Sequence, residues 1–254
     1  MRPLSALLAL SVGLSAQSPA APTPFKVLAL QGETAHVQGI DTDGASLWVT
    51  SVDRAQRKGY LQQYSVQDGH LLKSLEIQDG DRYHPGGIAT DANSVWIPLA
   101  EYRAKSTAVI QQRNKRTFAL EFQFAVPDHI GCVAVTETLI IGGNWDSRDF
   151  YIWDRQGKLI SKIPSSTGNA YQDLKVHDGV LVASGSLSAH QGAVDWLDPV
   201  SMTLVRRLLM GNTNRGNSFT REGMTIFGNQ LLLLPEDGAS RLFVFELPGT
   251  TVAH

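Results

Sequence analysis

Residues 36–53 read HVQGIDTDGASLWVTSVD, two apolar runs separated by the pair Asp43-Gly44. An Asp-Gly pair between apolar runs is a tight-turn signal, so this stretch predicts a β-hairpin with strands at 39–43 and 47–53. Two further strands are expected at 60–66 and 71–77, separated by a second pair, Asp68-Gly69. Together they form one antiparallel unit of four short strands, and no helical period follows the N-terminal segment.

The same unit recurs five times along the chain. The repeats open at five equivalent segments, His36-Val-Gln-Gly-Ile40, His84-Pro-Gly-Gly-Ile88, His129-Ile-Gly-Cys-Val133, Tyr171-Gln-Asp-Leu-Lys175 and Thr220-Arg-Glu-Gly-Met224. Their first residues are 48, 45, 42 and 49 positions apart. This spacing suits the four-stranded blade of a β-propeller.

The number of strands indicates how the ring closes. The fifth unit has only three strands, near 223–227, 231–234 and 241–247, and a spare strand at 25–30 precedes the first unit. Pairing the spare strand with the last unit would complete the blade and cover an open sheet edge. The predicted fold is therefore all-β, a five-bladed β-propeller whose last blade is closed by the N-terminal strand of the mature chain.

The N-terminal segment has the pattern of an export signal. Arg2 precedes an apolar run over 4–14, and small residues with three prolines follow it. We expect a signal peptide over 1–21, an uncertain cleavage site, and a single propeller domain over 22–254 in a secreted or periplasmic protein. The one cysteine, Cys132, cannot form an internal disulfide and is expected to pack in a strand.

Charge and hydropathy exclude two classes of partner. The formal net charge of −2 provides no basic surface for nucleic acid. No later apolar run approaches the roughly 20 residues of a membrane span. We expect a monomer whose partner is a small polar molecule or a metal ion.

Propeller topology gathers polar residues at one end of the central channel. The segments that open each repeat and the loops between second and third strands lie on the same face. The residues expected there as ligand-binding groups are Gln38, Arg54, Glu101, Arg103, Trp145, Asp146, Tyr171, Arg221 and Glu236. Trp145 stands between glycines and charged residues, where an aromatic ring offers a rigid flat surface, and the arginines suit a carboxylate or phosphate.

Three of the seven histidines, His36, His84 and His129, occupy equivalent positions in consecutive repeats. Imidazole nitrogens are good ligands for zinc and similar transition metals, which are favoured here over calcium. Glu222 and Asp173 are the candidate catalytic residues, as a general base or a carboxylate ligand. A metal-free polar pocket and a purely structural role for the histidines remain as alternatives.

Two resemblances extend this interpretation. An uncharacterised family of bacterial exported propellers is similar in five segments, His36-Val-Gln-Gly-Ile-Asp41, Tyr83-His-Pro-Gly-Gly-Ile88, Gly143-Asn-Trp-Asp-Ser-Arg148, Tyr171-Gln-Asp-Leu-Lys175 and Leu234-Pro-Glu-Asp-Gly238. Val37-Gln-Gly-Ile-Asp-Thr-Asp-Gly44 is also similar to the first-blade opening of plant-type glutaminyl cyclotransferases, which are five-bladed propellers. That family carries a Gly-Glu-Gly-type segment in the next blade, whereas here the Glu-Gly pair is Glu222-Gly223 in the fifth unit.

The sequence thus supports several functions. The favoured one is binding of a metal ion or small polar ligand at the mouth of the channel, because no catalytic motif is complete. The alternative is an enzyme, either a metal-assisted hydrolase of lactone or ester type, with a metal-activated water and Glu222 or Asp173 as base, or a glutaminyl-cyclotransferase-like activity. A protein-interaction scaffold is a second alternative.

Overall fold

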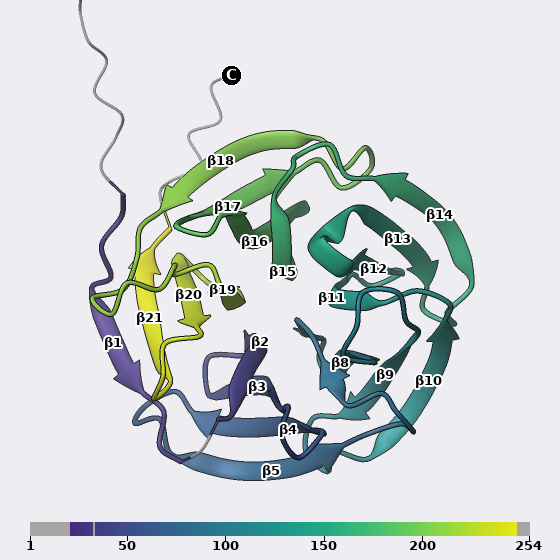
Figure 1. Ribbon diagram of the computed structural model, residues 1–254, viewed down its shortest axis with the longest axis horizontal. Helices are drawn as coiled ribbons and strands as arrows, with labels where there is room; N and C mark the ends of the chain where they lie inside the picture. Colours follow the sequence, from purple (N-terminus) through teal and green to yellow (C-terminus); the bar gives the residue numbers. More distant parts are fainter. Residues whose placement is uncertain (1–20, 33, 248–254) are drawn as a thin grey trace, which may run out of the picture.

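In the computed structural model, which describes residues 21–32 and 34–247, five antiparallel sheets stand around a central axis like the blades of a propeller (Figure 1). The predicted all-β fold with five blades is confirmed. The signal segment predicted over 1–21 lies outside the described residues except for Ala21. Within the described part of the chain, no helix has the length and apolar character needed to cross a membrane.

The first three blades follow the chain in order, each running outward from the axis. Blade 1 contains β2 (His36–Thr42), β3 (Ser46–Asp53), β4 (Lys58–Ser65) and β5 (Leu71–Ile77). Blade 2 contains β6 (His84–Pro85), β7 (Ala89–Thr90), β8 (Ser94–Ala100), β9 (Ala108–Asn114) and β10 (Leu120–Val126). Blade 3 contains β11 (Ile130–Val135), β12 (Leu139–Asn144), β13 (Asp149–Asp154) and β14 (Leu159–Pro164).

The last two blades complete the ring. Blade 4 contains β15 (Ala170–His177), β16 (Val180–Ser188), β17 (Gln191–Leu197) and β18 (Leu204–Met210). Blade 5 contains β19 (Glu222–Phe227), β20 (Gln230–Pro235) and β21 (Arg241–Glu246), with β1 (Lys26–Ala29) as its outer strand. β1 pairs antiparallel with β21, with Lys26 opposite Val244. The predicted closure by the N-terminal strand is therefore confirmed.

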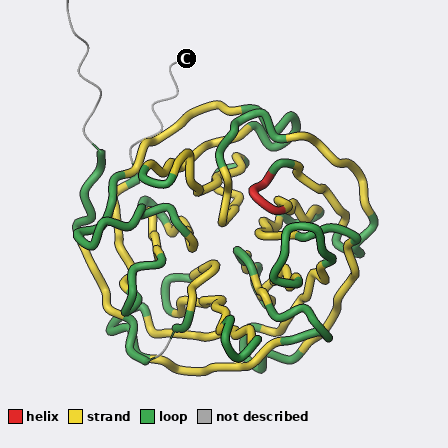
Figure 2. The backbone as a smooth tube through the Cα atoms, in the orientation of Figure 1, coloured by secondary structure: helices red, strands yellow, loops and turns green. Residues whose placement is uncertain are grey.

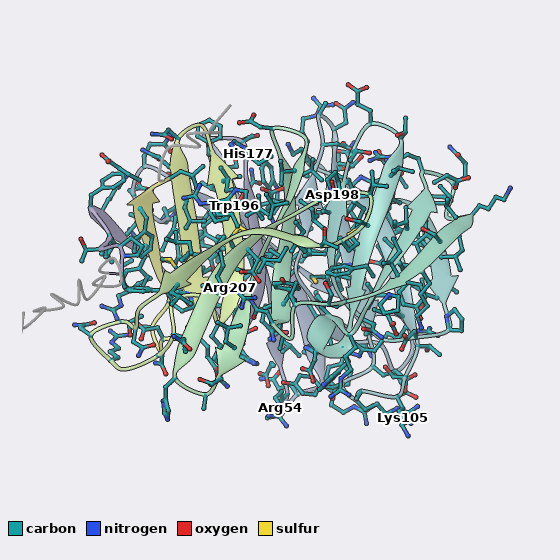
Figure 3. The ribbon with its side chains drawn as sticks, turned by 90° about the horizontal axis from the view of Figure 1, so that it is seen from above. Arg54, Lys105, His177, Trp196, Asp198 and Arg207 are labelled. Carbon is teal, nitrogen blue, oxygen red and sulfur yellow. The ribbon has the colours of Figure 1, made fainter. Side chains whose placement is uncertain are left out.

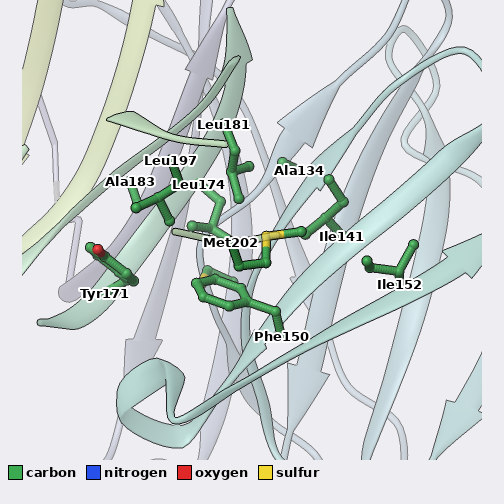
Figure 4. Close-up of a cluster of buried hydrophobic side chains, with 11 residues drawn as sticks. Ala134, Ile141, Phe150, Ile152, Tyr171, Leu174, Leu181, Ala183, Leu197 and Met202 are labelled. Atoms are coloured by element: carbon green, nitrogen blue, oxygen red, sulfur yellow. The ribbon is translucent and has the colours of Figure 1, made fainter. Parts of the chain in front are cut away.

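The hydrophobic core lies between neighbouring blades rather than at one centre. Between blades 3 and 4, for example, Phe150, Leu174 and Met202 are fully buried in one cluster (Figure 4). The inner strands alternate little in burial because both of their faces are covered, whereas the outer strands β5, β10 and β14 alternate between half-buried and exposed residues. The one helix of the described residues is a short 3-10 turn, η1 (Trp145–Ser147), drawn red in Figure 2.

Bulges interrupt the innermost strands at equivalent positions. The pairing register shifts between Val37 and Gly39 in β2, between Ile130 and Cys132 in β11, and between Tyr171 and Asp173 in β15. The first strand was predicted to begin at residue 39, but pairing of His36 with Val52 extends it to residue 36. Each bulge leaves one residue unpaired, which re-aims the side chains on either side of it.

Near the axis the blades approach so closely that glycine is required. A Cβ on Gly86 would lie 1.9 Å from the carbonyl oxygen of Gly131, which belongs to the backbone of the next blade. We expect Gly86→Ala to lower the free energy of unfolding by about 1–3 kcal/mol or more, because the backbone must shift to relieve the overlap. The measurement is chemical denaturation followed by tryptophan fluorescence.

A neighbouring glycine provides the matched control for that substitution. A Cβ on Gly131 would meet its nearest atom at 3.7 Å, an ordinary contact. Gly131→Ala is therefore expected to stay near wild-type stability. Equal losses in the two variants would contradict the proposed overlap.

Candidate functional site

The channel mouth is the face on which the inner strands begin. It carries a group of polar and aromatic side chains from blades 1, 2, 3 and 5, comprising His36, Gln38, Arg54, His84, Tyr102, His129, Trp145, Arg221, Glu222 and Glu236. Figure 3 shows Arg54 and Lys105 on this face and His177 on the opposite one. The predicted gathering of these loops at one end of the channel agrees with the fold.

One half of the mouth is ionic and spans the junction between blades 5 and 1. Nδ1 of His36 lies 3.3 Å from Oε1 of Glu236. Arg221 lies 3.3 Å from Glu236 and 3.8 Å from Oε1 of Glu222. One potential ligand atom each from His36, Glu222 and Glu236 lies within 4.8 Å of the other two.

Glu222 is the most unusual residue of this half. Only 6% of its surface is exposed, and its backbone φ of 98° falls in the region that favours glycine. Such a conformation costs about 1–3 kcal/mol and is found most often at functional sites. Burial raises the pKa of the Glu222 carboxyl to about 8, the carboxylates of Glu236 and Asp173 add to the rise, and Arg221 opposes it. A carboxyl in this state exchanges protons near neutral pH.

The other half of the mouth is aromatic and comes from blades 2 and 3. The ring of His84 lies 4.1 Å from that of Tyr102 and 5.4 Å from that of His129, and His129 meets Trp145 edge to face at 4.7 Å. The guanidinium of Arg54 covers the Tyr102 ring at 4.6 Å. These rings form a continuous wall beside the ionic half.

The three histidines of the mouth are held neutral. Burial lowers the pKa of His84 to about 3, helped by the neighbouring His129, His36 and Arg54. Burial also lowers the pKa of His129 and of His36; for His36, Glu236 opposes the shift, whereas Arg221 and Arg54 reinforce it. Their nitrogens therefore act as hydrogen-bonding groups or lone-pair donors rather than as cations.

Hydrogen bonds fix the orientation of two of these rings. Nε2 of His84 lies 2.7 Å from Oε1 of Gln38, whose amide nitrogen donates to the carbonyl of Val37. Because Gln38 accepts, Nε2 of His84 carries the proton, and Nδ1 has no hydrogen-bond partner among the described residues. Nδ1 of His129 lies 3.2 Å from the Ser106 hydroxyl and 3.1 Å from the carbonyl of Arg103.

The predicted set of three histidine ligands is not gathered around one point. In the described part of the chain, the group whose ligand atoms converge contains His36 with the two carboxylates, Glu222 and Glu236. His84 and His129 instead belong to the aromatic wall. The repeat places the three histidines equivalently, but their side chains take different partners.

Asp173 and Tyr171 were expected at the mouth, and the structure places both below it. The repeat alignment matched Asp173 with Gln38, but the bulges of β2 and β15 leave Gln38 and Gln172 unpaired, so the counterpart of Gln38 is Gln172 and Asp173 corresponds to Gly39. A one-residue shift turns a strand side chain to the other face. The Tyr171 hydroxyl donates to Asp195 at 2.6 Å inside the core of blade 4.

Asp173 fastens the blades to one another at the axis. Its Oδ2 accepts hydrogen bonds from the backbone N–H of Ile40 in blade 1 and of Met224 in blade 5. Its Oδ1 accepts from Nζ of Lys175 at 2.6 Å, and Lys175 also donates to the carbonyl of Ile88 in blade 2. These hydrogen bonds hold the Asp173 carboxylate at the axis, where it does not face the mouth.

The remaining predicted ligand-binding residues form pairs on the rim. Arg103 lies 2.6 Å from Glu101, and Arg148 lies 3.7 Å from Asp146. Tyr102 was not predicted, although it stands between Glu101 and Arg103 in a loop that was. Its position in that loop was the available signal.

Comparison with known proteins agrees with the fold. The crystal structure of glutaminyl cyclase from Myxococcus xanthus superposes with a TM-score of 0.66 at 13% identity, covering 89% of this chain and 97% of that one. The WD40 domain of Pan2 from Neurospora crassa (TM-score 0.47, 12% identity, 89% and 69% covered) and the computationally designed protein Ika8 (0.45, 12%, 86% and 73%) also match. No curated protein matches the sequence significantly.

One family model matches part of the sequence. The matched segment runs from the end of β3 to just after β14 and includes Arg54, His84, Tyr102, His129 and Trp145 of the mouth. The predicted resemblance to an uncharacterised family is thereby confirmed over that segment. Residues 53–166 of this chain match the family of unknown function DUF6454.

Proposed function

We propose that this propeller is an enzyme that binds a small polar substrate at the channel mouth and moves a proton within it through Glu222. The observation that carries the proposal is the buried Glu222 carboxyl, with its pKa raised to about 8, beside His36 and Glu236. A strongly perturbed carboxyl at a polar concave site is a typical acid–base group. The reaction class we propose is cyclisation of an N-terminal glutamine.

The chemistry of that reaction requires one group that both takes and gives a proton. The α-amino nitrogen attacks the side-chain amide carbon, a C–N bond forms, the bond to the amide nitrogen breaks, and ammonia leaves. The attacking amine loses a proton and the departing nitrogen gains one. A carboxyl with a pKa near 8 does both near neutral pH with little loss of driving force, so Glu222 is suited to carry the proton from one nitrogen to the other.

The position of Glu222 in the ring supports this assignment despite its late position in the chain. Blade 5 adjoins blade 1 on one side, as blade 2 does on the other. Gln38 of blade 1 therefore has His84 on one flank and the cluster of His36, Glu222 and Glu236 on the other. Glutaminyl cyclotransferases carry a Gly-Glu-Gly-type segment in the second blade, and we propose that Glu222-Gly223 of blade 5 takes its place on the other side of blade 1.

The test is release of ammonia from peptides that begin with glutamine, followed by mass spectrometry and a coupled ammonia assay. We expect turnover whose kcat/KM rises with pH and levels off above about pH 8, because Glu222 acts as a base in its ionised form. Peptides that begin with asparagine are the control, since their ring closure would give a strained four-membered ring. No conversion of glutaminyl peptides at any pH would exclude this reaction.

A divalent cation at the ionic half of the mouth is a second candidate. His36 offers a neutral imidazole whose Nδ1 has no hydrogen-bond partner among the described residues, since the approach of Glu236 lacks hydrogen-bond geometry. A set of one imidazole and two carboxylates suits zinc or a similar transition metal better than calcium, which prefers oxygen ligands throughout. Arg221 would have to move away from the carboxylates as the cation entered.

Elemental mass spectrometry of the untagged protein tests the cation. If it binds, we expect near-stoichiometric metal in the wild type and loss of that metal in His36→Ala. His177→Ala, on the opposite face, is the matched control. Wild-type protein that remains metal-free after incubation with zinc, manganese and copper would contradict this candidate and leave the proton-transfer proposal intact.

A further inference from the structure

The phenol hydroxyl of Tyr102 is a hydrogen-bond donor at the channel mouth. Tyr102 is half-buried and lies in the loop of residues 101–107, between β8 and β9. Its ring belongs to the aromatic wall, but its hydroxyl has no hydrogen-bond partner among the described residues. A ligand in the mouth can therefore accept a hydrogen bond from it without breaking an existing one.

Neighbouring side chains fix the ring of Tyr102 before any substrate binds. The guanidinium of Arg54 lies over it at 4.6 Å, and the ring of His84 lies 4.1 Å away. The ring of Tyr83 stacks 6.3 Å from it. Since Gln38 in turn orients His84, the phenol rests on a side chain that is itself held in place. A donor that is already oriented needs little reorganisation when charge develops on a substrate.

The loop that carries Tyr102 is tied at its base and to the next blade. The backbone N–H of Glu101 donates to the carbonyl of Thr107 at 3.3 Å, which closes the loop. Nδ1 of His129 in blade 3 lies 3.1 Å from the carbonyl of Arg103 and 3.2 Å from the hydroxyl of Ser106. The backbone on both sides of the tyrosine is thus held by hydrogen bonds.

The hydroxyl of Tyr102 shares its electrostatic environment with the proton-exchanging group. Burial raises the pKa of the Tyr102 phenol, and Arg54 opposes the rise. The carboxylates of Glu222 and Glu236 raise this pKa further. Because the interaction between charges weakens with distance, this coupling indicates that the hydroxyl faces the ionic half of the mouth. Near neutral pH the phenol is protonated and acts as a donor.

The proposed reaction creates a negative charge that a carboxyl group does not stabilise. As the α-amino nitrogen bonds to the side-chain amide carbon, an electron pair of the C=O bond moves onto the oxygen. When the bond to the departing nitrogen breaks, that pair re-forms the carbonyl, and ammonia leaves with a proton from Glu222. Between these steps the oxygen needs a hydrogen-bond donor. Arg221 is already engaged with Glu222 and Glu236.

We infer that Tyr102 is a catalytic residue whose hydroxyl donates a hydrogen bond to the amide oxygen of the substrate as that oxygen becomes negative. This inference rests on the proposed function. The phenol keeps its proton throughout, and its hydrogen bond is strongest in the transition state, so it lowers the barrier more than it tightens substrate binding. Glu222 then moves the proton, and Tyr102 stabilises the charge.

The experiment is Tyr102→Phe, which removes the hydroxyl and keeps the ring. We expect kcat for an uncharged pentapeptide that begins with glutamine to fall by about 10²–10³-fold, as on loss of one donor to a developing oxyanion. KM and Tm should stay close to those of the wild type. Tyr83→Phe is the matched control, because Tyr83 is also half-buried, has no hydroxyl partner among the described residues and lies under a guanidinium, that of Arg57 at 5.2 Å. Its kcat should stay within a few-fold of the wild type.

Tyr102→Ala separates the role of the hydroxyl from that of the ring. We expect it to be at least as slow as Tyr102→Phe. Wild-type kcat in Tyr102→Phe, even beside an inactive Tyr102→Ala, would show that only ring packing matters and would overturn the inference. A rise in KM without a loss of kcat, or an equal fall in Tyr83→Phe, would overturn it as well. A wild type that cyclises no glutaminyl peptide would instead exclude the proposed function, and the role of Tyr102 with it.

Discussion

Glu222→Gln is expected to lower kcat for glutaminyl substrates by about 10²–10⁴-fold, the usual contribution of a positioned acid–base group. The substitution keeps the size of the side chain and its place at the mouth, and it removes the proton that the carboxyl carries. KM should change little, because the amide can still hydrogen-bond the substrate. Comparison of kcat and KM for the two proteins at pH 8 is the measurement.

The pH dependence of stability provides a control that does not need a substrate. The pKa of Glu222 is raised from 4.5 to about 8 on folding, so the folded state holds a proton that the unfolded chain releases. The free energy of unfolding should therefore fall as pH rises from about 5 to 8, and Glu222→Gln should reduce this fall. A variant with unchanged kcat, or with the same pH dependence as the wild type, would show that Glu222 is not the titrating acid–base group.

A partly buried carboxylate on the rim separates this effect from a general loss of charge. Glu101 pairs with Arg103 and does not take part in the converging cluster of described residues. Glu101→Gln is expected to keep kcat within a few-fold of the wild type. A similar fall in both variants would indicate that charge at the mouth, rather than the proton on Glu222, matters for turnover.

The fold could be predicted from sequence because its signals are local and repeated. Asp43-Gly44 and Asp68-Gly69 mark turns at fixed distances from apolar runs, and the strand at 26–29 makes up the deficit in the last blade. Each repeat buries its apolar faces against its neighbours, so the number of units alone determines the ring. Strand ends differed by a few residues because pairing continues past the apolar core, as it does at His36.

The functional site was only partly predictable, since it depends on features that the repeat does not encode. The bulges at Gln38 and Gln172 show that Asp173 was matched to the wrong residue of blade 1, and a bulge is a property of strand pairing rather than of residue type. The three histidines occupy equivalent positions in the repeat, yet Gln38 binds His84 and Trp145 packs on His129. Equivalence in sequence predicts position along a strand, but the neighbours determine the direction of each side chain.

Asp173→Ala is expected to lower the free energy of unfolding by about 3–5 kcal/mol, because it breaks a buried ion pair. The carboxylate is fully buried and accepts from Ile40, Met224 and Lys175. Removing it leaves the Lys175 ammonium, itself 6% exposed, without its counter-charge at the axis. Thermal unfolding should show a drop in Tm of roughly 6–20 °C for a chain of this size.

The matched control breaks an ion pair in solvent. Asp81 lies 3.0 Å from Arg57 with 83% of its side chain exposed, so Asp81→Ala should change the free energy of unfolding by less than about 1 kcal/mol. Adding Lys175→Met to Asp173→Asn removes both charges and should cost less than the two single substitutions added together. An Asp173→Ala protein as stable as Asp81→Ala would contradict the assigned role of the axial carboxylate.

The axial carboxylate also bears on the mouth above it. Met224, whose N–H binds Asp173, lies two residues after Glu222 in β19, and Ile40 lies two residues after Gln38 in β2. The same carboxylate therefore holds in register the two strands that carry the proton-exchanging group and its neighbour. We accordingly expect Asp173→Asn, measured at a temperature where it is folded, to lower kcat even though its side chain never reaches the substrate. Asp173 would then contribute to both stability and turnover, because its hydrogen bonds at the axis also position the strands that carry the residues of the mouth.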